Sequence, residues 1–191
     1  MIIGLIGYMR SGKTTAAGFL ETMHRFQRVS FKDALVAEMK ENFPDLLNEI
    51  AVGNGYHQIG GVVPEPDIWE LFKEKPPLMR ALMQNYGTEV RRKDDPNYWI
   101  KRWIEGSEIP GDIVVDDVRF KNEAEAVRAR GGVLIRVERT DITSGGDHAS
   151  ETQMDGVVAD YTISAGPGEL DEIYKKIDII YGQEKLKEDK G

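Results

Sequence analysis

The apolar positions of the chain form short unbroken runs that alternate with stretches of helical periodicity. The runs of β-branched and aliphatic residues predict strands at 2–6, 29–31, 112–115, 133–137 and 160–163. The periodic stretches predict helices at 13–24, 33–42, 67–75, 77–92, 96–105, 122–130 and 169–181. Strands that are apolar throughout need cover on both faces, so this alternation predicts an α/β fold with a parallel β-sheet flanked by helices.

Residues 44–66 do not follow this alternation. They are rich in glycine and proline and are predicted to form a loop. The length of 191 residues fits one domain. The predicted parts of this domain are a core of about 1–42 and 111–182, a helical insert of about 43–110 that binds a substrate, a lid of about 139–156 and a polar tail of 183–191.

Composition narrows the classes of function. The formal net charge of -8 argues against stable binding to nucleic acid, which needs clustered Lys and Arg. The absence of cysteine excludes disulfides, thiolate metal sites and a cysteine nucleophile, and it fits the cytoplasm. No run approaches the ~20 apolar residues of a membrane span, so no membrane association is expected.

The first predicted strand leads into GYMRSGKTT at residues 7–15, which matches G-x-x-x-x-G-K-[ST]. The backbone N–H groups of such a loop and the N-terminus of the following helix hold phosphates. The Lys13 side chain should reach the β- and γ-phosphates, and the Thr14 hydroxyl should bind Mg²⁺. The predicted contacts to the triphosphate, taken to be ATP, are Gly7, Arg10, Ser11, Gly12, Lys13, Thr14 and Thr15.

Charged residues also follow two later strands. Asp116 and Asp117 end the strand at 112–115, and one of them could hold Mg²⁺; the spacing does not choose between them, and helix capping is the alternative. Arg119 comes directly after this pair and could point into the same cleft. Asp33, after the second strand, could accept a hydrogen bond or a proton from a substrate, with helix capping equally open.

The predicted helix at 77–92 carries a polar stripe. Arg80, Gln84, Gly87 and Arg91 lie at i, i+4, i+7 and i+11, and two arginines with an amide suit a phosphate and a base edge. The adjoining apolar arc, expected to face a core, contains Leu78, Met79, Leu82, Met83, Tyr86 and Val90. A mid-helix glycine costs ~1 kcal/mol relative to alanine, which favours a substrate site over a plain solvated face.

A polar segment after the strand at 133–137 reads RTDITSGGDHASE and predicts a lid. Arg139 lies at its base, and Gly145 and Gly146 could act as hinges. A lid excludes water from phosphoryl transfer, and an arginine neutralises charge in the transition state.

Taken together, GYMRSGKTT, SFKDAL, R-x-x-x-Q-x-x-G-T-E-x-x-R, DVRFKNEAEAVRARGG and DHASE resemble the deoxynucleoside monophosphate kinases of bacteriophages. The chain is more distantly similar to dephospho-CoA kinase and phosphomevalonate kinase. The resemblance covers about residues 1–165 and implies Mg²⁺-dependent transfer of the γ-phosphoryl group of ATP to a deoxynucleoside 5′-monophosphate.

With this family in view, the candidate residues take roles. The candidate catalytic residues are Lys13, Asp33, Arg119 and Arg139, and the candidate metal ligands are Thr14, Asp116 and Asp117. The candidate acceptor contacts are Asp33, Arg80, Gln84, Gly87, Arg91 and Asp117, with His148, Ser150 and Glu151 in the lid. The stretch ISAGPGEL, with Ser164, departs from the Asn-Gly that relatives place near the adenine.

Three alternatives stay open at this stage. One is a kinase for another small acceptor, such as a coenzyme precursor. The second is a kinase for hydroxymethylated bases in DNA, which the net charge of -8 disfavours. The third is a nucleotide-binding switch without catalysis, which gives the arginine-bearing helix no purpose. The sequence leaves the base preference, the sugar preference and the oligomeric state open, a homodimer included.

Overall fold

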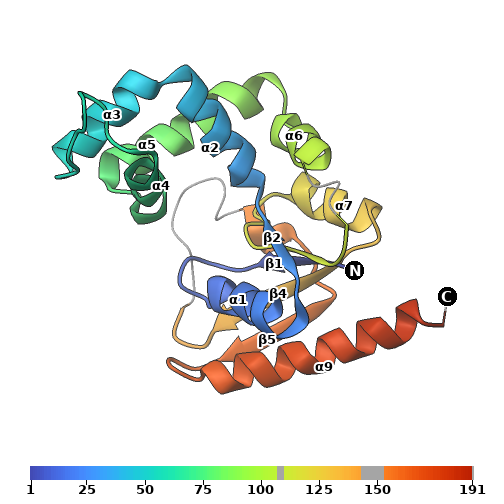
Figure 1. Cartoon of the computed structure of the whole chain (residues 1–191). Coiled ribbons are helices and arrows are strands. Elements are labelled where there is room, and N and C mark those ends of the chain that lie inside the picture. Colours follow the sequence, from blue (N-terminus) through green and yellow to red (C-terminus); the bar gives the residue numbers. More distant parts are fainter. Residues whose placement is uncertain (107–109, 143–152, 191) are drawn as a thin grey trace. The chain divides into compact units, whose positions relative to one another are not determined.

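The computed structural model describes residues 1–106, 110–142 and 153–190, and it contains a five-stranded parallel β-sheet flanked by helices (Figure 1). The strands are β1 (Ile2–Ile6), β2 (Gln27–Val29), β3 (Ile113–Val115), β4 (Val133–Arg139) and β5 (Tyr161–Ala165), in the order β2-β3-β1-β4-β5. Every pair of neighbouring strands is parallel. The predicted α/β fold class is therefore confirmed.

The helices lie close to their predicted positions, with exceptions described below. They are α1 (Lys13–His24), α2 (Phe31–Asn42), α3 (Pro44–Gly53), α4 (Glu65–Glu74), α5 (Pro77–Gln84), the π-helix η1 (Asn85–Arg92), α6 (Tyr98–Gly106), α7 (Lys121–Ala129), the 3₁₀ turn η2 (Gln153–Gly156) and α9 (Leu170–Glu188). Among the described helices, none combines the length and the apolar character needed to cross a membrane.

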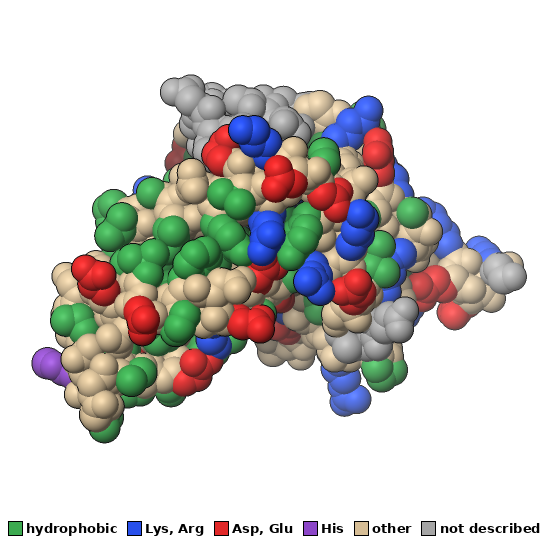
Figure 2. Space-filling model, turned by 90° about the horizontal axis from the view of Figure 1, so that it is seen from above, with side chains coloured by type: hydrophobic (Ala, Val, Ile, Leu, Met, Phe, Trp, Pro, Cys, Tyr) green, Lys and Arg blue, Asp and Glu red, His purple; other side chains and the backbone are tan. Residues whose placement is uncertain are grey.

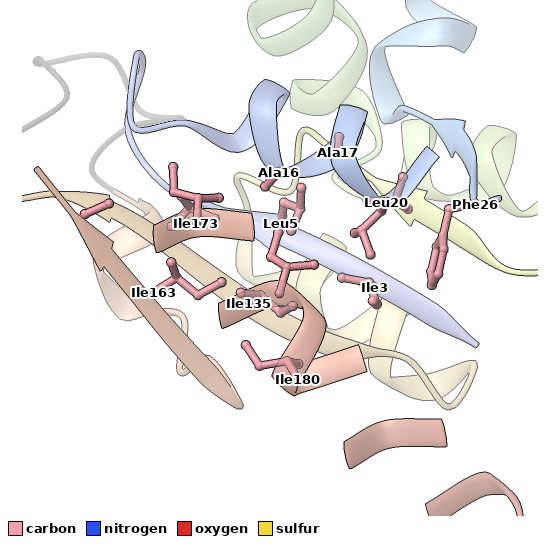
Figure 3. Packing of buried hydrophobic residues seen from close by; sticks show 14 residues of the cluster. Ile3, Leu5, Ala16, Ala17, Leu20, Phe26, Ile135, Ile163, Ile173 and Ile180 are labelled. Carbon is pink, nitrogen blue, oxygen red and sulfur yellow. The ribbon is translucent and has the colours of Figure 1, made fainter. Parts of the chain in front are cut away.

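Side chains of β1 alternate between the two faces of the sheet, as the pleat requires. Ile3 and Leu5 pack in one cluster with Leu20 of α1 and Ile173 of α9 (Figure 3). On the other face, a Cβ added at Gly4 would lie 3.3 Å from Val127 Cγ1 of α7. Helices α1 and α9 thus cover one face and α7 the other, which explains why the strands are apolar throughout.

The central strand β1 positions the phosphate-binding motif. It pairs with β3 on one side and with β4 on the other. Its carboxyl end therefore lies where the strand order reverses, the place at which open parallel sheets bind ligands. The glycine-rich loop and the N-terminus of α1 follow directly from this end.

Contacts within the chain divide it into two compact units. Unit 1 comprises Met1–Phe31 and Ile104–Gly191 and contains the sheet; unit 2 comprises Lys32–Trp103 and is mainly helical (Figure 1). The boundary differs from the predicted one because α2 belongs to unit 2. Its apolar residues, such as Val36 and Met39, are buried with Met79 and Trp99 of unit 2 and not against the sheet.

The predicted loop at 44–66 is wrong over its first part, which forms α3. Leu47, Ile50 and Ala51 are buried there in the core of unit 2. Their spacing of three and four is helical. The helix is only ten residues long, so its periodicity was outweighed by the glycines and prolines on either side.

The predicted polar tail at 183–191 is also wrong, because α9 continues to Glu188. Glu184 is buried and accepts hydrogen bonds from Tyr161 of β5 and from Lys187 at 2.5 Å. Lys185 pairs with Asp112 at 3.0 Å. These polar contacts to the edge of the sheet hold the last turns of a helix whose sequence has little apolar character.

Candidate active site

The loop between β1 and α1 has a backbone that requires glycine at two positions. Gly7 has a φ of 152° and Gly12 a φ of 106°. A Cβ added at Gly7 would lie 2.2 Å from the carbonyl oxygen of Val137 on β4. Arg10 also lies in the left-handed region, with a φ of 66°, although it carries a side chain. The loop can therefore pass this close to β4 only without a side chain at Gly7.

The N-terminus of α1 has no capping side chain among the residues that the structure describes. Its first turn has no acidic residue. The Ser11 hydroxyl is buried and has no hydrogen-bond partner among the described residues. Thr14 is exposed and Thr15 half-buried on the same first turn. The backbone N–H groups of a helix start, its positive dipole end and the buried Ser11 hydroxyl together fit a phosphate group.

The Lys13 ammonium group lies inside this loop. It donates hydrogen bonds to the carbonyl oxygens of Gly7 at 2.5 Å and Tyr8 at 2.7 Å. A phosphate oxygen in the loop would offer the ammonium group a charged acceptor, which binds more strongly than a carbonyl. Lys13 is thus placed where the sequence predicts it.

Arg139, the last residue of β4, lies beside the loop. Its Nε and Nη2 atoms donate to the carboxylate of Asp141 at 2.9 Å and 2.6 Å, and Nη1 lies 3.5 Å from the Arg10 carbonyl oxygen. The hydrogen bonds from Arg139 hold the pKa of Asp141 below its usual range. The sequence predicted Arg139 for the site but not Asp141, its partner.

The two carboxylates after β3 lie at the same sheet edge as the loop, because β3 pairs with β1 in parallel. Asp116 is buried; it accepts a hydrogen bond from the Ser30 hydroxyl at 2.5 Å and lies 3.6 Å from Arg28 Nη1. Asp117 accepts the backbone N–H of Phe31 at 2.9 Å, at the start of α2. Neither Ser30, the first residue of the SFKDAL stretch, nor Arg28 was predicted as a site residue, because no local spacing links them to Asp116.

Mg²⁺ prefers oxygen ligands, such as those of hydroxyl and carboxylate groups. The Thr14 hydroxyl at the start of α1 and a carboxylate at the end of β3 form such a set. Among the described residues, no group of three or more His, Cys, Asp or Glu could hold a metal ion.

Arg119 and Asp33 lie near the starts of two helices. Arg119 is half-buried, and its backbone N–H donates to the Glu123 carboxylate at 2.7 Å, next to the start of α7. Asp33 is exposed in the first turn of α2 and belongs to unit 2. His148, Ser150 and Glu151 lie outside the described residues.

The predicted stripe on the helix at 77–92 is not continuous. Arg80 and Gln84 are exposed on α5, one turn apart, but the helix becomes the π-helix η1 at Asn85. A π-helix bonds i to i+5, so positions beyond Gln84 no longer follow the α-helical register. Gly87 is buried and Arg91 half-buried, and the four residues do not form a single exposed face.

The apolar arc of this helix is correct only in part. Met79, Met83 and Tyr86 are buried as predicted. Leu78 and Val90 are instead exposed, by 62% and 40%. Val90 lies in η1, where the change of helix type moves it away from its predicted direction.

Gly87 has a packing role in the structure. An added Cβ would lie 3.4 Å from Leu35 Cδ2, an ordinary van der Waals distance, and the Gly87 carbonyl accepts the Trp99 indole N–H at 2.9 Å. The interpretation that Gly87 opens space for a ligand is therefore not supported by this packing.

Gly87→Ala tests the packing role. We expect the free energy of unfolding to change by less than about 1 kcal/mol, because the methyl group fits and alanine favours helix. The KM for the nucleoside monophosphate should stay within about twofold of wild type, because a residue that does not contact the substrate does not alter its binding directly. Thermal unfolding and steady-state kinetics measure both. A large rise in the KM for the nucleoside monophosphate with unchanged stability would show that Gly87 contributes to substrate binding and would contradict a role in packing alone.

Arg91 is held by three residues of unit 2. Glu38 of α2 forms a short ion pair with Arg91 and accepts hydrogen bonds from the hydroxyls of Tyr86 and Tyr98, each at 2.6 Å. Burial raises the pKa of Glu38, but the hydrogen bonds from Tyr86, Tyr98 and Arg91 outweigh it and hold the pKa below its usual value. Neither Glu38 nor Tyr98 was predicted, because no local spacing links them to Arg91.

A glycine-rich loop between the central strand and the first helix of a parallel sheet, with Lys13 inside it and carboxylates beside it, defines a P-loop nucleotide-binding protein. The family model for deoxynucleotide monophosphate kinase matches residues 67–177, more than half of the 191-residue chain. The chain belongs to the deoxynucleotide monophosphate kinase family.

One curated relative carries the name of the same family. A protein of Acanthamoeba polyphaga mimivirus, named "Putative deoxynucleotide monophosphate kinase", is 29% identical, and the match covers 93% of this chain and 94% of that protein. Two solved structures are more distant. A dephospho-CoA kinase from Campylobacter jejuni has 13% identity and a TM-score of 0.44, covering 95% of this chain and 96% of its own. A Thermus thermophilus protein has 18% identity and a TM-score of 0.42, covering 96% and 97%.

The family membership confirms the resemblance found in the sequence. The chain is an ATP-dependent nucleotide kinase, and its substrates are small-molecule nucleotides.

Proposed function

We propose that this kinase binds the triphosphate of ATP in the loop at residues 7–15 and transfers the γ-phosphoryl group to the 5′-phosphate of a deoxynucleoside monophosphate. The observation that carries the donor site is the uncapped start of α1 with the unpaired Ser11 hydroxyl and the Lys13 ammonium group beside it. Family membership supports the class of acceptor. In unit 2, the exposed Arg80 and Gln84 and the half-exposed Arg91 are the proposed acceptor contacts.

The proposed reaction needs no strong general base. An oxygen of the acceptor phosphate is already anionic near neutral pH; it forms a bond to the γ-phosphorus while the bond between this phosphorus and the β–γ bridging oxygen breaks, and ADP leaves. Catalysis then consists of positioning the two nucleotides and neutralising negative charge. Positive charge comes from Lys13, Arg119 and Arg139. The Asp33 carboxylate orients the monophosphate substrate by accepting a hydrogen bond from it.

Mg²⁺ is part of this proposal. The Thr14 hydroxyl and one of Asp116 and Asp117 would hold the ion, directly or through water. When bound, Mg²⁺ supplies charge neutralisation to the phosphates of ATP. Buried Asp116 is oriented by Ser30, whereas Asp117 also caps the start of α2, so both carboxylates are fixed before any ligand binds.

The remaining parts of the proposal concern the lid, the partners and the location. We propose that residues 139–156 form a lid. Further contacts to the acceptor nucleotide are proposed for Asp117, His148, Ser150 and Glu151. The resemblance of the motifs to bacteriophage enzymes supports these proposals and a bacteriophage source. No stable nucleic-acid complex is proposed: the net charge is -8, and Lys and Arg alternate with Asp and Glu on the face shown in Figure 2. A cytoplasmic location fits the absence of cysteine.

A substrate panel tests the proposal. ADP release is measured with ATP and Mg²⁺ against all deoxy- and ribonucleoside monophosphates, with dephospho-CoA and hydroxymethylated DNA as further acceptors and a reaction without acceptor. We expect turnover with one or more deoxynucleotides. Turnover with dephospho-CoA or modified DNA alone, or ATP binding with no turnover across the panel, would contradict the proposed function.

A further inference from the structure

The carboxylate of Glu38 is the centre of a small, partly buried polar cluster in unit 2. Its side chain is 12% exposed. One oxygen accepts from the Tyr86 hydroxyl at 2.6 Å and pairs with Arg91 Nη2, and the other accepts from the Tyr98 hydroxyl at 2.6 Å. A buried carboxylate is stable only when such donors replace water, so the cluster has one well-defined arrangement.

The cluster fixes one edge of the Arg91 guanidinium group, and two tyrosine rings lie close to it. Nε and Nη2 donate to the Tyr86 hydroxyl at 3.1 Å and 2.8 Å. The Arg91 Cζ atom lies 5.2 Å from the ring centre of Tyr86 and 5.1 Å from that of Tyr98. Both rings are therefore within the range of cation–π attraction.

The other edge of Arg91 stays available. Nη1 makes no hydrogen bond to any of the described residues, and the side chain is 35% exposed. The guanidinium group is thus held at its Nε and Nη2 edge, while its Nη1 edge can bind a ligand. Its chemistry suits an oxygen anion such as a phosphate, which guanidinium N–H groups bind with good geometry.

We infer that Glu38 is a positioning residue for this kinase: with Tyr86 and Tyr98 it holds Arg91 so that Nη1 is presented to the phosphate of the acceptor nucleotide. This inference rests on the proposed function, which places the acceptor at Arg91. A flexible arginine loses rotamer freedom when it binds an anion, whereas an arginine that is already fixed does not.

The negative charge of Glu38 also acts in the opposite direction, since it weakens the attraction between Arg91 and a phosphate. Two tyrosine hydroxyls donate to this carboxylate and spread its charge. Replacing the carboxylate by an amide would put an NH₂ donor where one oxygen now accepts a hydrogen bond and would end the ion pair, so Arg91 would leave its present orientation. We therefore expect the loss of orientation to exceed the gain in attraction.

Glu38→Gln tests the inference, with Glu65→Gln as the matched control. Glu65 also pairs with a cation of α2, Lys40, but its side chain is 61% exposed. For Glu38→Gln we expect the acceptor KM to rise about tenfold while the KM for ATP stays within about twofold. Glu65→Gln should change neither. A role in stability alone would lower the folded fraction, and with it the apparent kcat, without raising one KM selectively.

Tyr98→Phe is a milder second variant, in case Glu38→Gln does not fold. It keeps the ring beside Arg91 and the ion pair with Glu38 but removes one hydroxyl donor. We expect a rise of about threefold in acceptor KM. Wild-type turnover is measured first, because its absence would contradict the proposed function itself. With turnover present, an acceptor KM that is unchanged or lower in the folded variants overturns the inference, as do equal rises in both KM values.

Discussion

Lys13→Ala should lower kcat by about 10³-fold, the effect of removing one preorganised charge-stabilising group from an active site. The Lys13 ammonium group lies in the phosphate loop, where it donates, among the described residues, to the backbone carbonyl oxygens of Gly7 and Tyr8. These neutral acceptors give little net stability, so the free energy of unfolding should fall by about 1 kcal/mol at most. The variant should therefore lose most of its kcat while it keeps most of its free energy of unfolding.

The measurement is kcat for ADP release at saturating ATP and acceptor, together with a urea unfolding curve. Lys175→Ala on α9 is the control, because Lys175 is exposed and its ion pair among the described residues is with Glu172, one turn away on the same helix. The control should keep wild-type kcat. A Lys13→Ala protein with more than about a tenth of wild-type kcat would contradict the role of Lys13 in phosphoryl transfer.

Gly7→Ala should both destabilise the protein and abolish ATP binding. The added methyl group would lie 2.2 Å from the Val137 carbonyl oxygen and 2.6 Å from the Ser11 hydroxyl, at a φ of 152°. Strain of the backbone and overpacking against β4 together should lower the free energy of unfolding by about 3 kcal/mol. Relief of the clash would move the loop, so we expect the affinity for ATP to fall at least about 100-fold.

Urea unfolding and a titration with ATP measure the two effects of Gly7→Ala. Gly53→Ala is the control, since Gly53 is the last residue of α3 and an added Cβ there meets no atom within 4 Å. That substitution should be neutral or stabilise by about 0.5 kcal/mol. If Gly7→Ala unfolds like wild type and still binds ATP, the close approach of the loop to β4 is not required for the site.

The proposed function also requires that charged groups in each unit are held in place before the nucleotides bind. In unit 1, Asp141 holds Arg139 through two hydrogen bonds and Ser30 holds Asp116. In unit 2, Glu38 holds Arg91. Each of these charged groups is oriented by a neighbour for which the sequence predicted no role. Preorganisation of this kind lowers the reorganisation that the reaction requires.

The sequence determined those features that depend on local spacing. Unbroken apolar runs such as residues 2–6 and 133–137 predicted buried parallel strands, because both faces of each strand need cover. The spacing of Gly7, Gly12, Lys13 and Thr14 predicted the phosphate loop, since a backbone turn of this kind needs glycine at set positions. These signals lie within a few neighbouring residues, so they survive without knowledge of the rest of the chain.

Only the tertiary structure decided the features that join distant segments. Burial of Val36 and Met39 with Met79 assigned α2 to unit 2, and the contacts of Glu184 with β5 extended α9. In η1 the wider π-helical turn buries Gly87 and ends the α-helical register, which the sequence alone extends through Arg91. The cluster at Glu38 joins segments 48 and 60 residues apart in sequence. The periodicity of a sequence does not predict such pairs of residues. Their stability comes from bringing hydrogen-bond donors and acceptors together in the folded chain and not from local conformation.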